Sequence, residues 1–237
     1  MKLSEHERAI EKKALEFARS NKKRIAKAFT DKATYPSEEN PVSVFMAGSP
    51  GAGKTEASIA LVENAPKGVI RIDPDSLRTH FEDYDGSNSY LFQRGVSVLV
   101  DKIHDLALKQ KQSFILDGTL SNYDIAVKNI GRSLGKQRSV LILYVYQEPK
   151  QAWDFVTARE QVEGRRILAK HFIQQYYQAR DVVNQLKKTY QENIVVDLLI
   201  KNVDGSNRRR IANIDNIDNH KPEKYTRSEI EHIVKLL

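Results

Sequence analysis

The 237-residue sequence predicts an α/β fold: a mostly parallel sheet of five strands with helices on both faces, plus an N-terminal helical extension. Short apolar, β-branched runs alternate along the chain with longer segments of helical periodicity, as in strands joined by crossover helices. In addition, residues 48–55 fill every fixed position of the pattern G-x-x-x-x-G-K-[ST], and they stand between a predicted strand and a predicted helix.

The first segment of the chain is predicted to be helical. Residues 5–29 are rich in Ala, Glu, Lys and Arg, and their apolar side chains recur at near-helical spacing, which predicts one or two amphipathic helices packed on the main domain. Residues 34–41 are polar and bracketed by two prolines, which is typical of a linker. We therefore expect a helical extension over residues 1–35 and one larger domain over 36–237.

A predicted buried strand at 42–47 leads into the glycine-rich segment Gly48-Ser49-Pro50-Gly51-Ala52-Gly53-Lys54-Thr55. Glycines let the backbone turn so that its N–H groups converge on phosphate oxygens, and the following helix presents its positive end to the same anion. Lys54 adds a mobile positive charge, and the Thr55 hydroxyl can ligate Mg²⁺. This P-loop predicts a nucleoside triphosphate bound with Mg²⁺.

Two further predicted strands lead to carboxylates: the strand at 68–72 ends in the acidic turn that begins at Asp73, and the strand at 113–119 closes on Asp117. The carboxyl ends of parallel strands face one crevice, so the acidic turn after the second strand should lie beside the P-loop. Asp73 and Asp75 both qualify as a general base, and Asp75 is favoured because it lies beyond the strand and Pro74; a plain turn-and-cap role remains the alternative. Asp117 stands where a carboxylate holds Mg²⁺ directly or through water.

The rest of the chain continues the alternation, with helices predicted at 90–109 and 124–134 and strands at 139–146 and 193–200. The region from about 153 to 190 is predicted to be a basic helix-turn-helix that closes over the nucleotide as a lid. It carries Arg159, Arg165 and Arg166, whose planar guanidinium groups suit a phosphoryl transition state. The arginine run at 208–210 is assigned no element, and a capping box at Thr226 opens a terminal helix.

Composition narrows the function classes. The chain has no Cys, which excludes thiolate chemistry and fits a reducing compartment, and neither a signal peptide nor a membrane-spanning run is evident, so a soluble cytoplasmic protein is expected. The net charge of +7 suits phosphate ligands as well as nucleic acid. Because the aromatic residues are not interleaved with the basic ones, nucleic acid is not the favoured partner.

Taken in order, these motifs resemble the zeta-toxin family of small P-loop kinases, bacterial toxins that use ATP to phosphorylate a hydroxyl of UDP-N-acetylglucosamine or related nucleotide sugars. The resemblance covers about residues 42–202. It rests on the P-loop, the acidic turn 73–78, the segment 117–120, and the segment 157–160 followed by Gly164 and Arg165. It implies that Lys54 binds phosphate and that Asp75 deprotonates the sugar hydroxyl.

The resemblance also assigns residues around these two. Arg159 and Arg165 would clamp the transferring phosphoryl group, with the adjacent Arg166 as the alternative to Arg165. Asp101 falls where the family places an acidic residue that contacts the sugar, and Thr119 is the second residue assigned to the substrate. Asp117 and Thr119 match a Glu-Gly-Thr motif, with a shorter acid and with Ser where an Arg commonly follows, and these departures affect the identity of the sugar more than phosphoryl transfer.

The expected function is therefore an ATP-dependent kinase acting on a nucleotide sugar of the UDP-N-acetylglucosamine type. Two alternatives stay open: a P-loop kinase for another hydroxyl, such as a nucleic-acid end, an antibiotic or a dinucleotide, and an ATP-binding interaction module without turnover. Because an antitoxin helix can block the nucleotide site in the family, the resemblance also implies an antitoxin partner, or inhibition in cis by the helices before Tyr35.

Overall fold

The computed structural model describes residues 3–65, 68–164, 167–222 and 224–235, and within them the chain forms a six-stranded sheet in the order β2-β3-β1-β4-β5-β6. Five strands are parallel, as predicted. They are β1 (Val42–Ala47), β2 (Ile70–Ile72), β3 (Phe114–Leu116), β4 (Ser139–Tyr146) and β5 (Val195–Lys201). The sixth strand, β6 (Asn207–Ile211), pairs antiparallel with β5 at the edge. The expectation of five strands was therefore one short.

The missed strand β6 contains the arginine run that we assigned to no element. Its side chains are exposed except for the half-buried Ile211, so it shows no apolar alternation and resembles a solvated segment. Charged residues on an edge strand discourage pairing with another chain. Arg210 also bonds to the carboxylate of Asp197, which is 2% exposed on β5. A buried carboxylate needs such a partner, so this arginine stabilises the sheet.

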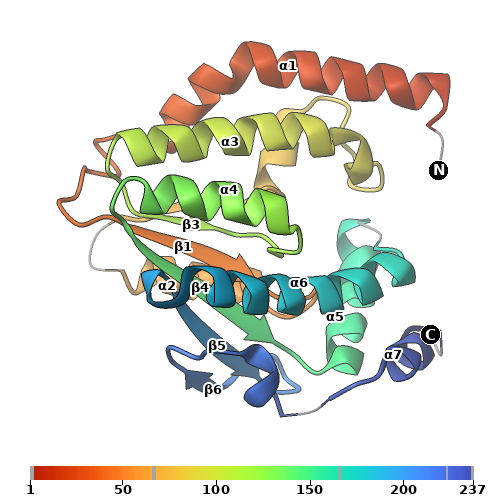
Figure 1. Cartoon of the computed structure of the whole chain (residues 1–237). Coiled ribbons are helices and arrows are strands. Elements are labelled where there is room, and N and C mark those ends of the chain that lie inside the picture. Colours follow the sequence, from red (N-terminus) through yellow and green to blue (C-terminus); the bar gives the residue numbers. More distant parts are fainter. Residues whose placement is uncertain (1–2, 66–67, 165–166, 223, 236–237) are drawn as a thin grey trace.

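Helices cover both faces of the sheet, because alternate residues of each strand point to opposite sides. Phe45 joins the larger core, under α3 (Gln93–Lys109), α4 (Tyr123–Leu134) and α6 (Ala169–Tyr190). Its neighbour Met46 joins a smaller cluster under α2 (Lys54–Glu63). Figure 1 shows α3, α4 and α6 stacked along the sheet. This arrangement confirms the predicted fold class.

The N-terminal segment forms one helix, α1 (Glu5–Phe29), which begins with a capping box between Ser4 and Glu7. It lies along α3 rather than on the sheet (Figure 1). Ala18 and Ala26 are fully buried there and belong to the same core as the strands. The carbonyl oxygens of Thr30 and Tyr35, which follow α1, accept hydrogen bonds from the side chain of Gln112, which precedes β3. The hydrophobic core therefore continues across residue 35.

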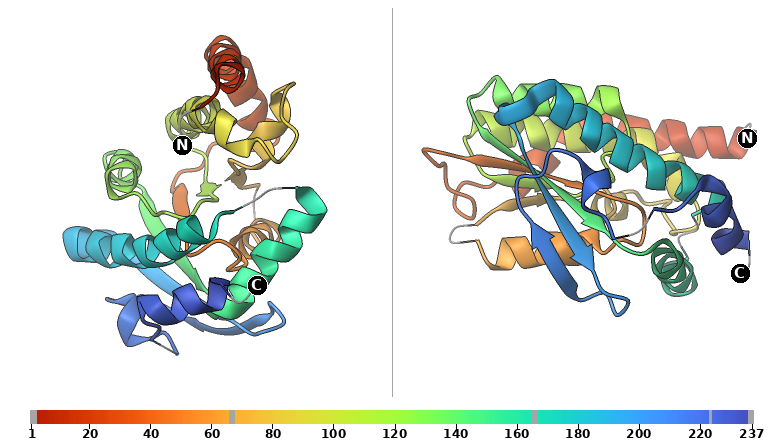
Figure 2. Two further views of the ribbon diagram at one scale, coloured as in Figure 1. Left: turned by 90° about the vertical axis from the view of Figure 1, so that its right-hand side faces the viewer. Right: turned by 60° about the horizontal axis from the view of Figure 1, so that its bottom comes forward.

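At the carboxyl ends of the strands, α5 (Pro149–Glu163), the first half of α6 and α7 (Arg227–Lys235) share a separate hydrophobic cluster. Both views of Figure 2 show α5 and α7 at that end of the molecule. The second half of α6 packs into the main core instead, through residues such as Val183 and Leu186. The segment predicted as a lid is thus a pair of helices anchored at one end in the main core.

Short 3-10 turns complete the chain at Ser76–His80, Ser89–Phe92, Gln191–Asn193 and Ile217–Asn219. Within the described part of the chain, no helix combines the length and the apolar character needed to cross a bilayer.

Candidate functional site

The P-loop connects β1 to α2 and is held tightly by its neighbours. Gly48 donates its N–H to the carbonyl oxygen of Thr119 (3.3 Å), which ties the loop to the segment after β3. Gly51 has φ of 72°, and a Cβ added there would lie 2.0 Å from the carbonyl oxygen of Ala152 on α5. Only glycine fits that approach. The loop is therefore wedged between the end of the sheet and the first turn of α5.

Lys54 is the first residue of α2, directly after the loop. Its Nζ donates to the carbonyl oxygen of Ser49 (2.6 Å), so the side chain folds back over the loop. The N-terminal turn of α2 leaves backbone N–H groups without helical acceptors and carries the positive end of the helix dipole. The loop, the lysine and the helix end therefore form a cradle suited to a phosphate chain.

The acidic turn after β2 contains two aspartates with different surroundings. The Asp73 carboxylate accepts bonds from the Asp75 N–H (2.8 Å) and from Arg71 (2.9 Å), and burial raises the pKa of Asp73 despite that arginine. The Asp75 side chain is 32% exposed and pairs with Arg78, while Arg159 of α5 lies 3.8 Å from its second oxygen. Asp73 thus braces the turn, whereas Asp75 faces the lid.

The predicted base and the predicted clamp therefore lie together, although they come from separate parts of the fold. Arg78 is 5% exposed and also donates to Gln93 (3.1 Å) of α3, which fixes its guanidinium group against Asp75. Arg159 is 43% exposed, so its side chain reaches over the acidic turn from the lid. The other predicted clamp, Arg165, and its alternative, Arg166, fall outside the described residues.

Asp117 lies at the end of β3 and is 7% exposed. Its Oδ2 accepts from the Ser58 hydroxyl of α2 (2.8 Å) and from Arg71 of β2. Since Arg71 also pairs with Asp73, one guanidinium group joins the ends of β2 and β3. The sheet order places β3 between β2 and β1, so the acidic turn after β2 and the P-loop after β1 follow strands that are not neighbours. Residues 117–119 stand between them.

The remaining predicted site residues divide into two groups. Thr119 is beside the P-loop, and its hydroxyl bonds to that of Ser121 (2.9 Å). Thr55 follows Lys54 in the first turn of α2. Asp101, by contrast, forms ion pairs with Arg132 (2.8 Å) and Lys128 (3.5 Å) of α4. Its predicted contact with a sugar therefore stays a prediction, and its ion pairs point it toward the seam between α3 and α4.

The donor set can be tested for Mg²⁺. Among the described residues, no group of three or more His, Cys, Asp or Glu side chains is arranged to hold a metal ion. Mg²⁺ in phosphotransfer sites needs only one or two protein oxygens, because phosphates and water supply the others. The hydroxyl of Thr55 and the carboxylate of Asp117 fit that smaller requirement, although Arg71 already neutralises much of the charge on Asp117.

Arg71, Arg78 and Lys201 were not identified by sequence reasoning. Arg78 had a usable signal, since it follows Asp75 by three residues within one turn. In the sequence, Arg71 is a polar residue between two apolar residues of a strand, which is common. Its role could not be predicted because its contact with Asp117 depends on which strand lies next to β2. Lys201 ends β5, and its Cε would lie 3.0 Å from a Cβ added to Gly53 of the P-loop.

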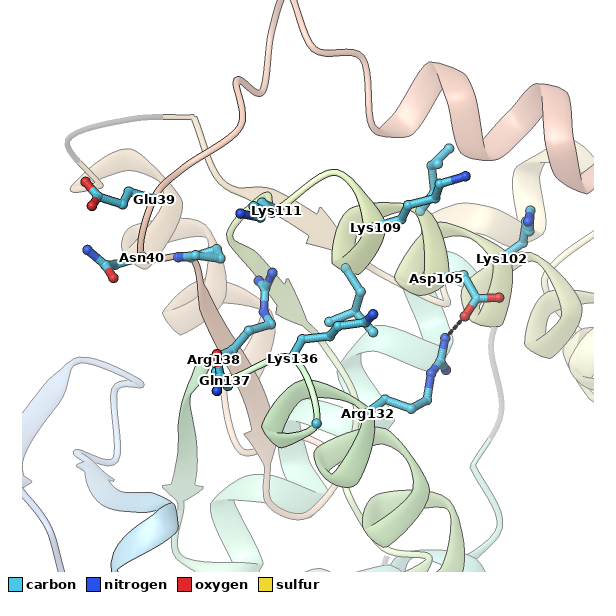
Figure 3. Close-up of a pocket in the computed structure, with 14 residues that line it drawn as sticks. Glu39, Asn40, Lys102, Asp105, Lys109, Lys111, Arg132, Lys136, Gln137 and Arg138 are labelled. Carbon is cyan, nitrogen blue, oxygen red and sulfur yellow. Dashed lines mark hydrogen bonds and ion pairs between the residues drawn. The ribbon is translucent and has the colours of Figure 1, made fainter.

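A hollow of about 970 Å³ lies elsewhere, at the amino ends of the strands (Figure 3). Pro41 and Arg138, which precede β1 and β4, line it, together with Lys109 and Lys136 near the C-terminal ends of α3 and α4. Lysines at helix C-termini complement the helix dipole, which accounts for this charge. No predicted site residue is among the described residues that line this hollow, so it is separate from the P-loop site.

Comparison with known proteins gives one family. A family model described as Zeta toxin matches residues 25–215. No curated protein matches the sequence. Among solved structures, a chain of the PezAT chromosomal toxin-antitoxin system of Streptococcus pneumoniae is 15% identical, with a TM-score of 0.65 over 99% of this chain and 94% of that one.

A second similar structure is the AvrRxo1-ORF1:-ORF2 complex with ATP. It is 17% identical with a TM-score of 0.55, and the match covers 86% of this chain and 65% of that one. The native form of the complex is 16% identical with a TM-score of 0.57, over 95% of this chain and 72% of that one. At these identities the likeness shows a shared fold.

Proposed function

Because the chain belongs to the zeta toxin family, we propose that it transfers the γ-phosphate of ATP to a hydroxyl of a nucleotide sugar of the UDP-N-acetylglucosamine type. One observation carries this proposal. Asp75 and Arg159, from the turn after β2 and from the lid, approach each other at the carboxyl ends of the strands, where the complete P-loop also lies. A base, a clamp and a phosphate cradle in one place are what phosphoryl transfer requires.

ATP is supported by the P-loop itself and by a similar solved complex that contains ATP. In the proposed reaction, the acceptor hydroxyl attacks the γ-phosphorus, and its proton passes to Asp75. A new O–P bond forms, the bond between the γ-phosphorus and the bridging β–γ oxygen breaks, and ADP leaves. Lys54 and the loop amides hold the phosphate chain, and catalysis arises mainly from positioning and charge neutralisation.

The ion pairs of Asp75 bear on its proposed role as a base. Arg78 orients the carboxylate from the buried side and Arg159 approaches it from the exposed side. The Arg159 contact is 3.8 Å long, so it is a loose pair that a phosphoryl group can displace. We propose that Arg159 moves from Oδ2 of Asp75 to the transferring group, which Arg165 would also bind. Oδ2 can then accept the proton while Arg78 holds Oδ1.

We assign Mg²⁺ to Thr55 and Asp117, with the nucleotide supplying most of the remaining oxygen ligands. When bound, the ion would neutralise charge on the phosphate oxygens. Since Oδ2 of Asp117 is engaged by Ser58 and Arg71, we propose that Asp117 acts through a water molecule rather than by direct ligation. Arg71 fixes the orientation of the carboxylate at the end of β3.

For the acceptor, Thr119 is the better placed of the two residues proposed to contact the sugar, because it adjoins the P-loop. Asp101 would have to exchange its ion pairs with α4 for a substrate hydroxyl. We also propose a protein antitoxin as partner and a cytoplasmic site of action. The similar solved structures support the partner, since they include a toxin-antitoxin system and a two-component complex.

The proposal is tested by incubating the protein with ATP, Mg²⁺ and a bacterial metabolite extract, followed by mass spectrometry. We expect a nucleotide sugar to gain one phosphoryl group, with an equal amount of ADP formed. Lys54→Ala, which removes the phosphate-binding charge, should abolish the product. A phosphorylated oligonucleotide end, antibiotic or dinucleotide would instead support a kinase of other specificity. ATP binding without ADP formation from any acceptor would contradict kinase activity.

A further inference from the structure

A lysine that the P-loop pattern does not include lies against the loop. Lys201 is the last residue of β5, and its side chain passes beside Gly53, so that a Cβ on that glycine would be 3.0 Å from Cε and 3.7 Å from Nζ. The pairing of β5 with β6 is irregular between Ile200 and Lys201. Such irregularities redirect side chains and are frequent next to active sites.

Lys201 is buried, but its ammonium group has fewer hydrogen-bond acceptors than donors. The residue is 9% exposed, and its Nζ donates to the amide oxygen of Asn207 (2.9 Å), although an ammonium group has three donors. Among the described residues, no carboxylate forms an ion pair with it. Glu56 lies near the same glycine, and Asp204 lies close enough for Lys201 to help lower its pKa, after the larger effect of Ser206.

Two other lysines with buried side chains have either more partners or a charged one. Lys187, in the last turn of α6, is 6% exposed and donates to the carbonyl oxygens of Gln191 and Ile194 (both 3.1 Å). The side chain of Lys221 is 4% exposed and pairs with the carboxylate of Asp218 (3.1 Å). Lysine is rarely buried unless it is paired, so Lys201 stands out as a buried cation with donors to spare.

The surroundings of Lys201 indicate which ligand would take those donors. It lines a recess of about 170 Å³ together with Gln147, Asn202 and Arg208, next to the loop that cradles phosphate. Arg208 adds a second positive charge to this recess, and Glu148 also lines it, with its carboxylate bonded to the Gln151 N–H and the Tyr225 hydroxyl. A phosphate chain seated on the P-loop would bring anionic oxygens to this side of Gly53, and a charge-assisted bond to such an oxygen would satisfy the ammonium group.

We propose that Lys201 is a second phosphate-binding lysine, which contacts the phosphate chain of the nucleotide from the β5 side of the P-loop. This inference rests on the proposed function only in requiring that the loop binds a nucleotide. It assigns no role in the chemical step to Lys201, which acts on nucleotide affinity.

The test is calorimetric titration of ATP, ADP and adenosine, each with Mg²⁺, into wild type, Lys201→Met and Lys201→Arg. We expect Lys201→Met to weaken ATP and ADP binding roughly 10- to 100-fold, the effect of losing one charge-assisted bond, and to leave adenosine binding unchanged. Lys201→Arg should restore part of the loss. Lys187→Met, which changes a buried lysine in the last turn of α6, near the amino end of β5, should bind ATP like wild type.

The outcomes separate this inference from the proposed function. Unchanged ATP affinity in Lys201→Met overturns the inference alone, as does an equal loss for adenosine, which would mean that Lys201 orders the recess and does not contact phosphate. A wild-type protein that binds no nucleotide overturns both. If Lys201→Met fails to fold by circular dichroism, Lys201→Gln, which keeps a donor to Asn207 but no charge, is measured with the same expectations.

Discussion

At the scale of single residues, Asp73 and Asp75 show how neighbours divide two similar side chains between two tasks. Asp73 caps its own turn and binds Arg71, while Asp75 is turned toward Arg78 and the lid. The preference for Asp75 follows from the sequence because Pro74 carries the chain out of the strand. The arginines around the pair could not be assigned in this way, since their contacts depend on which strands and helices become neighbours.

The glycines of the P-loop give a sharp prediction about stability. Gly51 combines φ of 72° with a Cβ position 2.0 Å from a backbone oxygen, whereas a Cβ on Gly118 would meet nothing within 4 Å. Gly51→Ala should therefore lower the free energy of unfolding by about 1–3 kcal/mol, through backbone strain and overpacking. The matched variant Gly118→Ala should stay within about 0.5 kcal/mol of wild type. Urea unfolding measures both, and equal effects would contradict the packing described for the loop.

At the scale of elements, the sequence predicts helices and strands that have a local hydrophobic pattern. It misses strand β6, which depends on pairing with another strand. Strands β1 and β4 are apolar runs, and α3 has a clear apolar face, so periodicity finds them. Strand β6 is held by pairing with β5 and by the bond from Arg210 to Asp197, neither of which is visible in a run of arginines. Tertiary pairing overrides local pattern there.

Helix α3 carries a buried histidine that makes stability depend on pH. His104 is 1% exposed and packs against the rings of Phe45 and Phe114. Burial, reinforced by the charge of Arg132, lowers the pKa of His104 from 6.5 to about 3. The unfolded chain therefore binds a proton below pH 6.5 that the folded chain excludes, so stability falls as the pH drops from 6.5 toward 3.

This histidine should contribute a slope of about 1.4 kcal/mol per pH unit to the free energy of unfolding below pH 6. His104→Asn keeps an acceptor for Arg132 but removes the titrating ring, so the variant should be less stable overall and should lose that part of the slope. Urea unfolding at pH 7, 6 and 5 measures the difference, in which Asp73 and the other acids cancel. Parallel pH profiles for the two proteins would exclude His104 as the cause.

At the scale of the whole molecule, the proposed functional residues all lie at the carboxyl ends of the parallel strands. The P-loop, the acidic turn, residues 117–119 and Lys201 all follow the carboxyl ends of parallel strands, whereas the basic hollow of Figure 3 lies at the amino ends. That these residues lie together at the carboxyl ends follows from the parallel topology, so it can be predicted from the sequence. The order of the strands cannot be predicted in this way. The position of β3 between the acidic turn and the P-loop is therefore known only from the structure.

The position of α1 bears on inhibition in cis, which remains a prediction. Lys13 pairs with Glu82 (3.2 Å) and Asp83 (3.0 Å), and Glu7 accepts from the Tyr90 hydroxyl, so α1 contacts the segment after the acidic turn. Because Ala18 and Ala26 belong to the main core, deleting α1 would disturb folding as well as any inhibition. Substitutions of exposed residues such as Lys13 would separate the two effects.

The central claim is that Asp75 acts as the base for an alcohol attacking ATP held on the P-loop. Its most direct test is the single-turnover rate of phosphoryl transfer in Asp75→Asn, measured with the acceptor identified by mass spectrometry, beside the dissociation constant for ATP. We predict a rate roughly 10²- to 10⁴-fold below wild type with ATP affinity within about twofold. A transfer rate near that of wild type, with Lys54→Ala inactive in the same assay, would contradict the assignment.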